Sequence, residues 1–170
     1  MAGRQDRMTA LSVRPATAVD ADAIWSIIEP IIRAGEVFAL PREMDWDAAL
    51  SYWLDGDHIP FVAEVNGAVV GTYYIRPNQM GGGHHVANAG YATHAEASGK
   101  GVARAMCAHS LEAARASGFR AMQFNFVVSS NVRAVRLWES MGFEEVGRLP
   151  GAFDHPSLGY VDALVMWRDL

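Results

Sequence analysis

The glycine-rich segment Ser98-Gly99-Lys100-Gly101-Val102-Ala103 joins an expected strand over residues 86–93 to an expected helix over residues 101–117. The first four or so N–H groups of a helix have no partner within the helix. Glycines let a phosphate approach those groups, and the helix dipole favours an anion there. Lys100 and Arg104 add positive charge in a chain of net charge −5. The turn therefore predicts a pyrophosphate site, with glycines for tight packing as the alternative.

Two better-known phosphate-binding patterns do not fit this turn. The dinucleotide pattern G-x-G-x-x-G needs a glycine where Arg104 stands. The P-loop needs a glycine at His94 and a Ser or Thr after Lys100, where Gly101 follows instead. The turn consequently belongs to another class of phosphate-binding site, which has to be identified from a second segment of the chain.

The composition narrows the classes of protein. The 170 residues are 51% hydrophobic and 19% charged, as in a globular domain, and no apolar run approaches the roughly 20 residues of a membrane span. The acidic balance argues against a nucleic-acid partner. Cys107 is the single cysteine, so an internal disulfide is excluded and a reducing cytoplasm fits. We expect no signal peptide, a disordered lead-in over residues 1–10 and one domain over residues 11–170.

The N-terminal half predicts a strand, two helices and a hairpin. Residues 11–16 alternate as a strand, and Thr17-x-x-Asp20 resembles a capping box. Isoleucines at helical spacing follow over residues 24–32, where Pro30 should kink or split the helix. A second helix should begin after Asp45, with one apolar face formed by Trp46, Leu50, Trp53 and Leu54.

The Asn66-Gly67 pair predicts a type I′ turn between strands over residues 61–65 and 69–75. Further strands are expected over residues 86–93 and 121–128. A helix capped by Ser130 or Asn131 comes next. Two closing strands, 144–149 and 160–168, should pair across a loop of Pro, Gly, Asp and His.

The expected element order, β-αα-β-β-β-α-β-α-β-β, defines the fold class. Hairpins come first, and one strand-helix-strand crossover should make a right-handed, parallel pair from residues 86–93 and 121–128. The sequence therefore predicts an α/β (α+β) fold: a mixed, mostly antiparallel sheet with helices on both faces.

A second segment carries a family resemblance. Residues 131–143 read Asn131-x-x-Ala134-x-x-Leu137-Trp138-x-x-x-Gly142-Phe143. With the turn at residues 98–103, this segment resembles the two motifs of the GNAT superfamily of acyl-CoA-dependent N-acetyltransferases, in order and at the expected separation. The resemblance covers about residues 11–170 and includes the element order.

The resemblance implies that the two parallel strands splay apart and that acetyl-CoA, the cosubstrate, enters the gap. The pantetheine arm would pair with the strand edge at Tyr91, Ala92 and Thr93. Asn131 and Trp138 would line its other side. The pyrophosphate would be held by Arg104 and by the backbone amides of Gly99, Lys100, Gly101, Val102 and Ala103.

Two residues depart from the family pattern. Ser98 stands where Arg or Gln is usual, which puts the strength of cofactor binding in doubt. Trp138 stands where many members have a tyrosine that protonates the leaving thiolate. An indole N–H has no useful acidity, so no conventional general acid is expected at Trp138.

Two segments, Asn88-Ala89-Gly90-Tyr91 and Phe124-Asn125-Phe126-Val127, carry a closer resemblance. They are similar to segments of the fungal acetyltransferases that detoxify L-azetidine-2-carboxylate, a proline analogue. This resemblance implies that Asn88 and Asn125, one on each splayed strand, lie at the acceptor site. A carboxamide can bind a carboxylate, a carbonyl or an amine without burying another charge. The alternative is that both merely satisfy backbone groups between the strands.

The predicted activity is acetyl transfer from acetyl-CoA to the amine of a small molecule, by direct attack of the neutral amine. Glu36, after the first helix, is the first candidate for the base, with a solvated surface side chain as its alternative. Further candidates are His84, His85, His94 and His155, because histidine titrates near neutrality, although a lone loop histidine is more often incidental. An acetyltransferase for protein N-termini or lysines, and a non-catalytic acetyl-CoA sensor, are competing hypotheses. A homodimer is expected from the resemblance alone.

No metal is expected. His84 and His85 are adjacent, so their side chains diverge on a strand, and Cys107 has no partner at ligand spacing. Cys107 falls on a helix face that is typical of core, which argues against a nucleophile.

Overall fold

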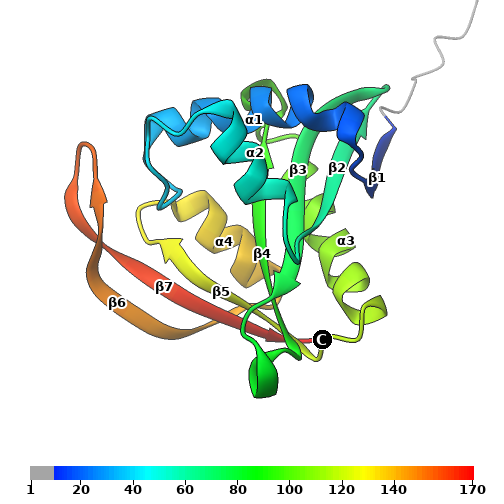
Figure 1. Ribbon diagram of the computed structural model, residues 1–170. Helices are drawn as coiled ribbons and strands as arrows, with labels where there is room; N and C mark the ends of the chain where they lie inside the picture. The colour runs from blue at the N-terminus through cyan, green and yellow to red at the C-terminus, as the bar shows by residue number, and fades with distance from the viewer. Residues whose placement is uncertain (1–9) are drawn as a thin grey trace, which may run out of the picture.

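The computed structural model describes residues 10–170 (Figure 1). Its sheet has seven strands in the order β1-β2-β3-β4-β5-β7-β6. Neighbouring strands are antiparallel except β4 and β5, which are parallel, and this confirms the predicted mixed sheet. The strands are β1 (Leu11–Pro15), β2 (Ile59–Val65), β3 (Ala68–Pro77), β4 (Val86–Thr93), β5 (Ala121–Val128), β6 (Glu144–His155) and β7 (Gly159–Asp169).

Helices cover both faces of this sheet, and each face has its own hydrophobic cluster (Figure 1). Helices α1 (Ala21–Ala34) and α2 (Trp46–Leu54) bury isoleucines and Trp53 against Val62, Tyr74 and Ala92. Helices α3 (Val102–Ala116) and α4 (Val132–Ser140) pack with the opposite face, around Met106, Met122 and Phe124. No helix within residues 10–170 is long and apolar enough to cross a membrane.

Strands β4 and β5 pair over only two residues and then separate. Val86 is in register with Ala121 and Ala87 with Met122. Within residues 10–170 these are the only pairs between β4 and β5. The two ribbons visibly diverge beyond this point (Figure 1). The predicted splay is therefore present, and it leaves the edge of β4 from Ala89 to Thr93 without a β5 neighbour.

Local signals placed several element ends correctly. Asn66 and Gly67 have φ of 52° and 80°, which the predicted I′ turn requires at both positions. Asp45 caps α2 by accepting from the Ala48 N–H at 2.9 Å. Asn131 caps α4 in the same way, from Ala134 at 3.4 Å. These caps form because each involves neighbours within three residues.

Three local predictions were wrong in whole or in part. Of the two outcomes expected at Pro30, the split does not occur: α1 is continuous from Ala21 to Ala34, because exposed Pro30 removes a hydrogen bond only on the solvent side, while isoleucines on the opposite side stay packed. Trp46 is 41% exposed because it starts α2 one turn before the residues that reach the core. The expected loop after Leu149 is mostly strand. β6 is an edge strand, so the missing N–H of Pro150 breaks no required hydrogen bond. The strand continues past Pro150 because residues 150–152 form an irregularity in its pairing with β7.

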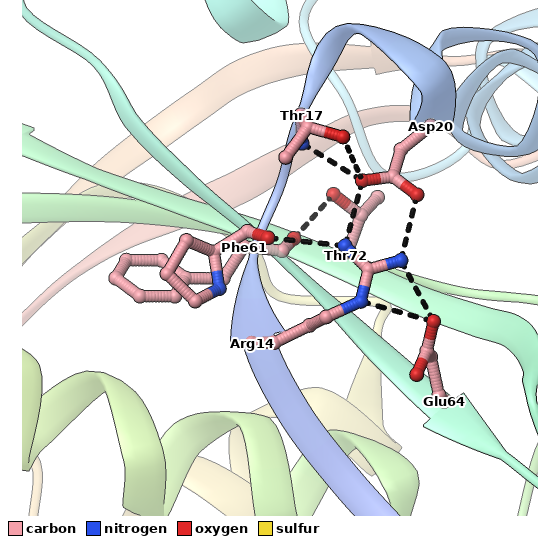
Figure 2. Close-up of polar contacts among 7 residues, drawn as sticks. Arg14, Thr17, Asp20, Phe61, Glu64 and Thr72 are labelled. Atoms are coloured by element: carbon pink, nitrogen blue, oxygen red, sulfur yellow. Dashed lines mark hydrogen bonds and ion pairs between the residues drawn. The ribbon is translucent and has the colours of Figure 1, made fainter.

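An ion cluster fixes the start of α1 to the sheet (Figure 2). The Arg14 guanidinium donates to both Asp20 carboxylate oxygens at 2.8 Å, and to Glu64 at 2.7 Å. Asp20 also accepts from the Thr17 N–H at 2.8 Å, the interaction predicted from the capping-box pattern. Thr72 lies beside this cluster, donating to the Phe61 carbonyl and accepting from the Trp53 indole. Strands β1, β2 and β3 and the α1–α2 layer are thereby tied together.

The prediction of a lead-in over residues 1–10 falls on residues 1–9, which lie outside the described part of the chain.

Candidate functional site

A cleft of about 710 Å³ lies where β4 and β5 separate. It runs through the sheet, because its lining comes from both layers: the α1–α2 segment and α2 on one side, the start of α3 and α4 on the other. Predicted site residues supply much of this lining: Asn88, Tyr91, Ala92, Thr93, Gly99, Gly101, Val102, Ala103, Arg104, Asn125, Asn131 and Trp138. Two predicted residues, Glu36 and Lys100, are not part of it.

The N-terminus of α3 presents free amides to the cleft. Gly99 and Gly101 have φ of 76° and 82°, values that side chains disfavour, and these turns bring the backbone to the helix start. No hydrogen bond within residues 10–170 uses the N–H groups of Gly101, Val102 or Ala103. A helix start with unpaired amides is a ready anion site.

The backbone N–H of Lys100 and the side chain of Arg104, the two cations named from the sequence, already have partners. The Lys100 N–H donates to the Ala97 carbonyl at 3.3 Å, so this amide already has a hydrogen-bond partner within the turn. The Arg104 guanidinium donates to Ser140 at 2.9 Å and to the Met141 sulfur, which directs it toward the end of α4. The anion-binding feature that remains without a partner at this end of the cleft is therefore the set of amides at residues 101–103.

One wall of the cleft is aromatic. Trp138 on α4 is 8% exposed, and its ring centre lies 4.9 Å from that of Tyr91 and 5.0 Å from that of Phe124. The Tyr91 hydroxyl contacts Ser110 at 2.6 Å, and burial raises its pKa well above the ordinary value. Trp138 thus fills the space beneath the splayed strands as an apolar surface. Asn131, the cap of α4, lines the same wall.

Asn88 and Asn125 lie on the opposite face, because their neighbours Ala89, Tyr91 and Phe124 belong to the α3–α4 cluster. The Asn88 amide donates to the Gln123 carbonyl of β5 at 2.9 Å, which spans the splay. This contact fixes the orientation of the carboxamide. The Asn88 oxygen accepts no hydrogen bond from residues 10–170, so it can receive one from a ligand.

Asn125 belongs to a chain of side-chain amides. It donates to Asn78 at 2.6 Å and accepts from Gln123 at 2.9 Å. Asn88 therefore satisfies a backbone group, as the alternative expectation held, and both asparagines also line the cleft. Together they form a fixed polar patch in otherwise apolar surroundings.

The wall facing this patch was not predicted in detail. It consists of residues 37–40, after α1, with Tyr52 from α2 and Tyr74 from β3. The Tyr52 and Tyr74 hydroxyls are 3.4 Å apart, and burial raises the Tyr74 pKa above its ordinary value. A Cβ at Gly90 would stand 2.8 Å from the Tyr74 hydroxyl, so a glycine at this position leaves room for the Tyr74 ring.

The ionisable side chains that line the cleft are tyrosines and arginines. Its lining, drawn from residues 10–170, contains no Asp, Glu, His or Cys. Glu36 is exposed and lies one residue before the lining segment. No group of three metal-ligating side chains occurs among the described residues. Buried Cys107 has a pKa raised to about 12 by burial, as in a core residue. The arrangement thus offers unpaired amides to an anion at one end and carboxamides to a polar ligand at the other.

These features define a class of protein, and comparison with known proteins agrees with it. The model of the acetyltransferase (GNAT) family matches residues 23–143. The structure of a GCN5-related N-acetyltransferase from Kribbella flavida is 42% identical, with a TM-score of 0.91 over 95% of this chain and 98% of that one. The protein belongs to the acetyltransferase (GNAT) family, which confirms the class predicted from the sequence, an acetyl-CoA-dependent acetyltransferase.

Two further relatives are informative. N-acetyltransferase aca1 of Schizosaccharomyces pombe is 34% identical over 104 residues, which are 58% of this chain and 47% of that protein. The match thus spans about half the length of this relative. The structure of yncA, a putative acetyltransferase from Salmonella typhimurium with its cofactor acetyl-CoA, is 22% identical, with a TM-score of 0.80 over 95% of both chains. At that identity the likeness shows the fold alone.

Proposed function

We propose that this protein transfers the acetyl group of acetyl-CoA to the amine of a small, amino-acid-like molecule. The observation that carries this proposal is one cleft with two unlike ends: unpaired helix amides at residues 101–103, and the carboxamides of Asn88 and Asn125 on the other face of the sheet. The first end suits a diphosphate and the second a small polar acceptor.

Acetyl-CoA would supply an activated acyl group, a thioester carbonyl open to attack by an amine. The chain's own contribution is to bind and orient. The amides of residues 101–103 hold the diphosphate, and the free edge of β4 near Tyr91–Thr93 pairs with the pantetheine arm. The Asn88 oxygen accepts from the acceptor amine. In direct transfer the amine nitrogen forms a bond to the carbonyl carbon, the carbon–sulfur bond breaks, and the nitrogen loses its proton to water.

The kinds of side chain in the cleft shape this mechanism. No carboxylate or imidazole lines the cleft within the described chain, so the acceptor amine has to arrive uncharged. Trp138 offers no acidic proton to the departing thiolate. The protein therefore works by proximity and orientation, a contribution that can be large for a neutral amine beside a thioester.

The lining formed by residues 37–40, Tyr52 and Tyr74 favours a small acceptor over a folded protein surface, because it adds bulky side chains on the α1–α2 side of the sheet, where Asn88 and Asn125 also lie. Among small acceptors we propose proline-like amino acids first, with L-azetidine-2-carboxylate as the initial test compound. We also propose that the protein forms a homodimer and acts in the cytoplasm.

Thiol release from acetyl-CoA, measured over a panel of amines and peptides, tests the proposal. Turnover with a small amino-acid-like amine supports it, turnover only with peptides would point to a protein acetyltransferase, and binding without turnover would point to a sensor. Asn88→Ala and Asn125→Ala should raise the acceptor KM while the Kd for acetyl-CoA stays near the wild-type value. An equal weakening of acceptor binding and of acetyl-CoA binding would refute the role of Asn88 and Asn125 as acceptor ligands.

The pH dependence tests the mechanism separately. If the amine arrives neutral, the pH at which kcat/KM levels off should follow the acceptor's own pKa from one amine to the next. A single bend at the same pH for all amines would instead identify a base on the protein, and Glu36→Gln is the first variant in which to look for its disappearance.

A further inference from the structure

Arg133, the second residue of α4, is a cation in the cleft that the sequence did not single out. Its guanidinium donates to the Ser98 hydroxyl at 3.1 Å, although 35 residues separate the two in the chain. A Cβ at Gly99 would stand 3.2 Å from its Nη2 atom. The guanidinium therefore lies over the Ser98–Gly99 turn, directly before the unpaired amides of residues 101–103.

The Arg133 guanidinium has more hydrogen-bond donors available to a ligand in the cleft than the nearby cations Arg104 and Lys100. Arg104 is committed to Ser140 and Met141, and Lys100 does not line the cleft. Among the described residues Arg133 pairs with no carboxylate and makes one side-chain hydrogen bond. A guanidinium has five N–H donors in a planar fork, so most of them remain available to a ligand.

The placement fits a phosphate-bearing ligand. Guanidinium groups bind phosphate oxygens through two parallel hydrogen bonds, and such charge-assisted bonds are stronger than neutral ones. Helix amides and a guanidinium on opposite sides of one anion would hold it from two elements, α3 and α4. In a protein of net charge −5, this local cation also offsets an unfavourable overall field.

We propose that Arg133 binds the diphosphate of the acyl donor, closing across the Ser98–Gly99 turn onto the ligand held by the α3 amides. This inference rests on the proposed function and adds a binding residue to it. It also predicts how α4 takes part, since the helix that carries Asn131 and Trp138 carries the anion-binding side chain at its start.

The test compares binding of two probes by calorimetry: acetyl-CoA, and S-acetylpantetheine, which has the same arm and no phosphate. Arg133→Ala should raise the Kd for acetyl-CoA about tenfold, the loss expected for a charge-assisted hydrogen bond, and leave the Kd for S-acetylpantetheine unchanged. The matched control is Arg136→Ala, which removes an equal charge from the same helix at an exposed position outside the cleft. It should leave both Kd values near the wild-type values.

A third probe and a rescue variant locate the contact. 3′-Dephospho-acetyl-CoA keeps the diphosphate, so the tenfold effect of Arg133→Ala should persist with it. Adding Ser98→Arg to Arg133→Ala returns a guanidinium to the same turn and should recover part of the affinity, because Ser98 and Arg133 are in contact.

The inference is overturned if Arg133→Ala binds acetyl-CoA as tightly as wild type, if it loses S-acetylpantetheine equally, if the effect vanishes with the dephospho probe, or if Ser98→Arg recovers nothing. Each of these outcomes leaves the proposed function standing. Failure of the wild-type protein to bind acetyl-CoA at all would instead remove the proposed function.

Discussion

Replacing Asp20 with Asn should destabilise the protein by an amount that depends on pH. The Asp20 carboxylate is 5% exposed and accepts two guanidinium bonds from Arg14 and one amide bond from Thr17 (Figure 2). The hydrogen bonds from Arg14, more than any other cause, lower its pKa from the ordinary 3.8 to about 2. The folded state therefore favours the ionised carboxylate.

The magnitude follows from linkage. A pKa difference of 3.8 − 2, about 1.8, corresponds to about 2.4 kcal/mol at neutral pH, at about 1.36 kcal/mol for each tenfold change. Arg14 is 37% exposed, so screening by water and salt reduces the expected value to about 2 kcal/mol. Because the folded pKa is the lower one, this stability is complete above about pH 5. It is lost as the pH falls through 2, and about half remains near pH 3.

Urea unfolding of wild type and Asp20→Asn at pH 7, 5, 4 and 3 measures this difference. The variant keeps an acceptor for Thr17, so the change isolates the carboxylate charge. Glu112→Gln is the control, since its partner Arg115 is a helix neighbour and Glu112 is 76% exposed; it should cost under about 0.5 kcal/mol. A difference for Asp20→Asn that stays constant from pH 7 to pH 3, or one as small as the control at pH 7, would refute the reasoning.

Two further predictions concern the cleft. Gly90→Ala places a Cβ 2.7–2.8 Å from the Tyr74 ring and hydroxyl, so the ring has to move. We expect the free energy of unfolding to fall by about 1–3 kcal/mol, and the acceptor KM to rise with little change in the Kd for acetyl-CoA. An unchanged acceptor KM would show that Tyr74 does not border the acceptor. Cys107 is buried with a pKa of about 12, so it should resist a disulfide thiol reagent at pH 8 in the native state and react on unfolding; rapid labelling of the folded protein would show that this site opens.

Much of the fold followed from patterns that act over short distances along the chain. The Asn66-Gly67 turn, the Asp45 cap and the bounds of β4 and β5 depend on backbone preferences and on neighbours a few residues away. The glycine-rich start of α3 is of the same kind. The two family motifs add the order of elements, and that order determines which strands are parallel.

The membership of the cleft was only partly predictable. Asn88, Asn125 and the turn at residues 99–103 came from motifs, but Tyr74 and the wall at residues 37–40 did not, because nothing in their local sequence marks the face they share. Alternation along β3 opposite β4 is the one signal that could have indicated Tyr74. For Arg133, its place two residues after the Asn131 cap was the available clue.

Patterns among residues close together in the chain predicted the class of protein, the helix start with unpaired amides and the strands that border the gap. Packing between distant segments settled the surroundings of that gap. It paired the Arg104 guanidinium with Ser140, left Glu36 outside the lining and brought Arg133 against Ser98. The direction of a long side chain depends on the partners that packing places within its reach, and the partners of Arg104 lie up to 37 residues away in the sequence.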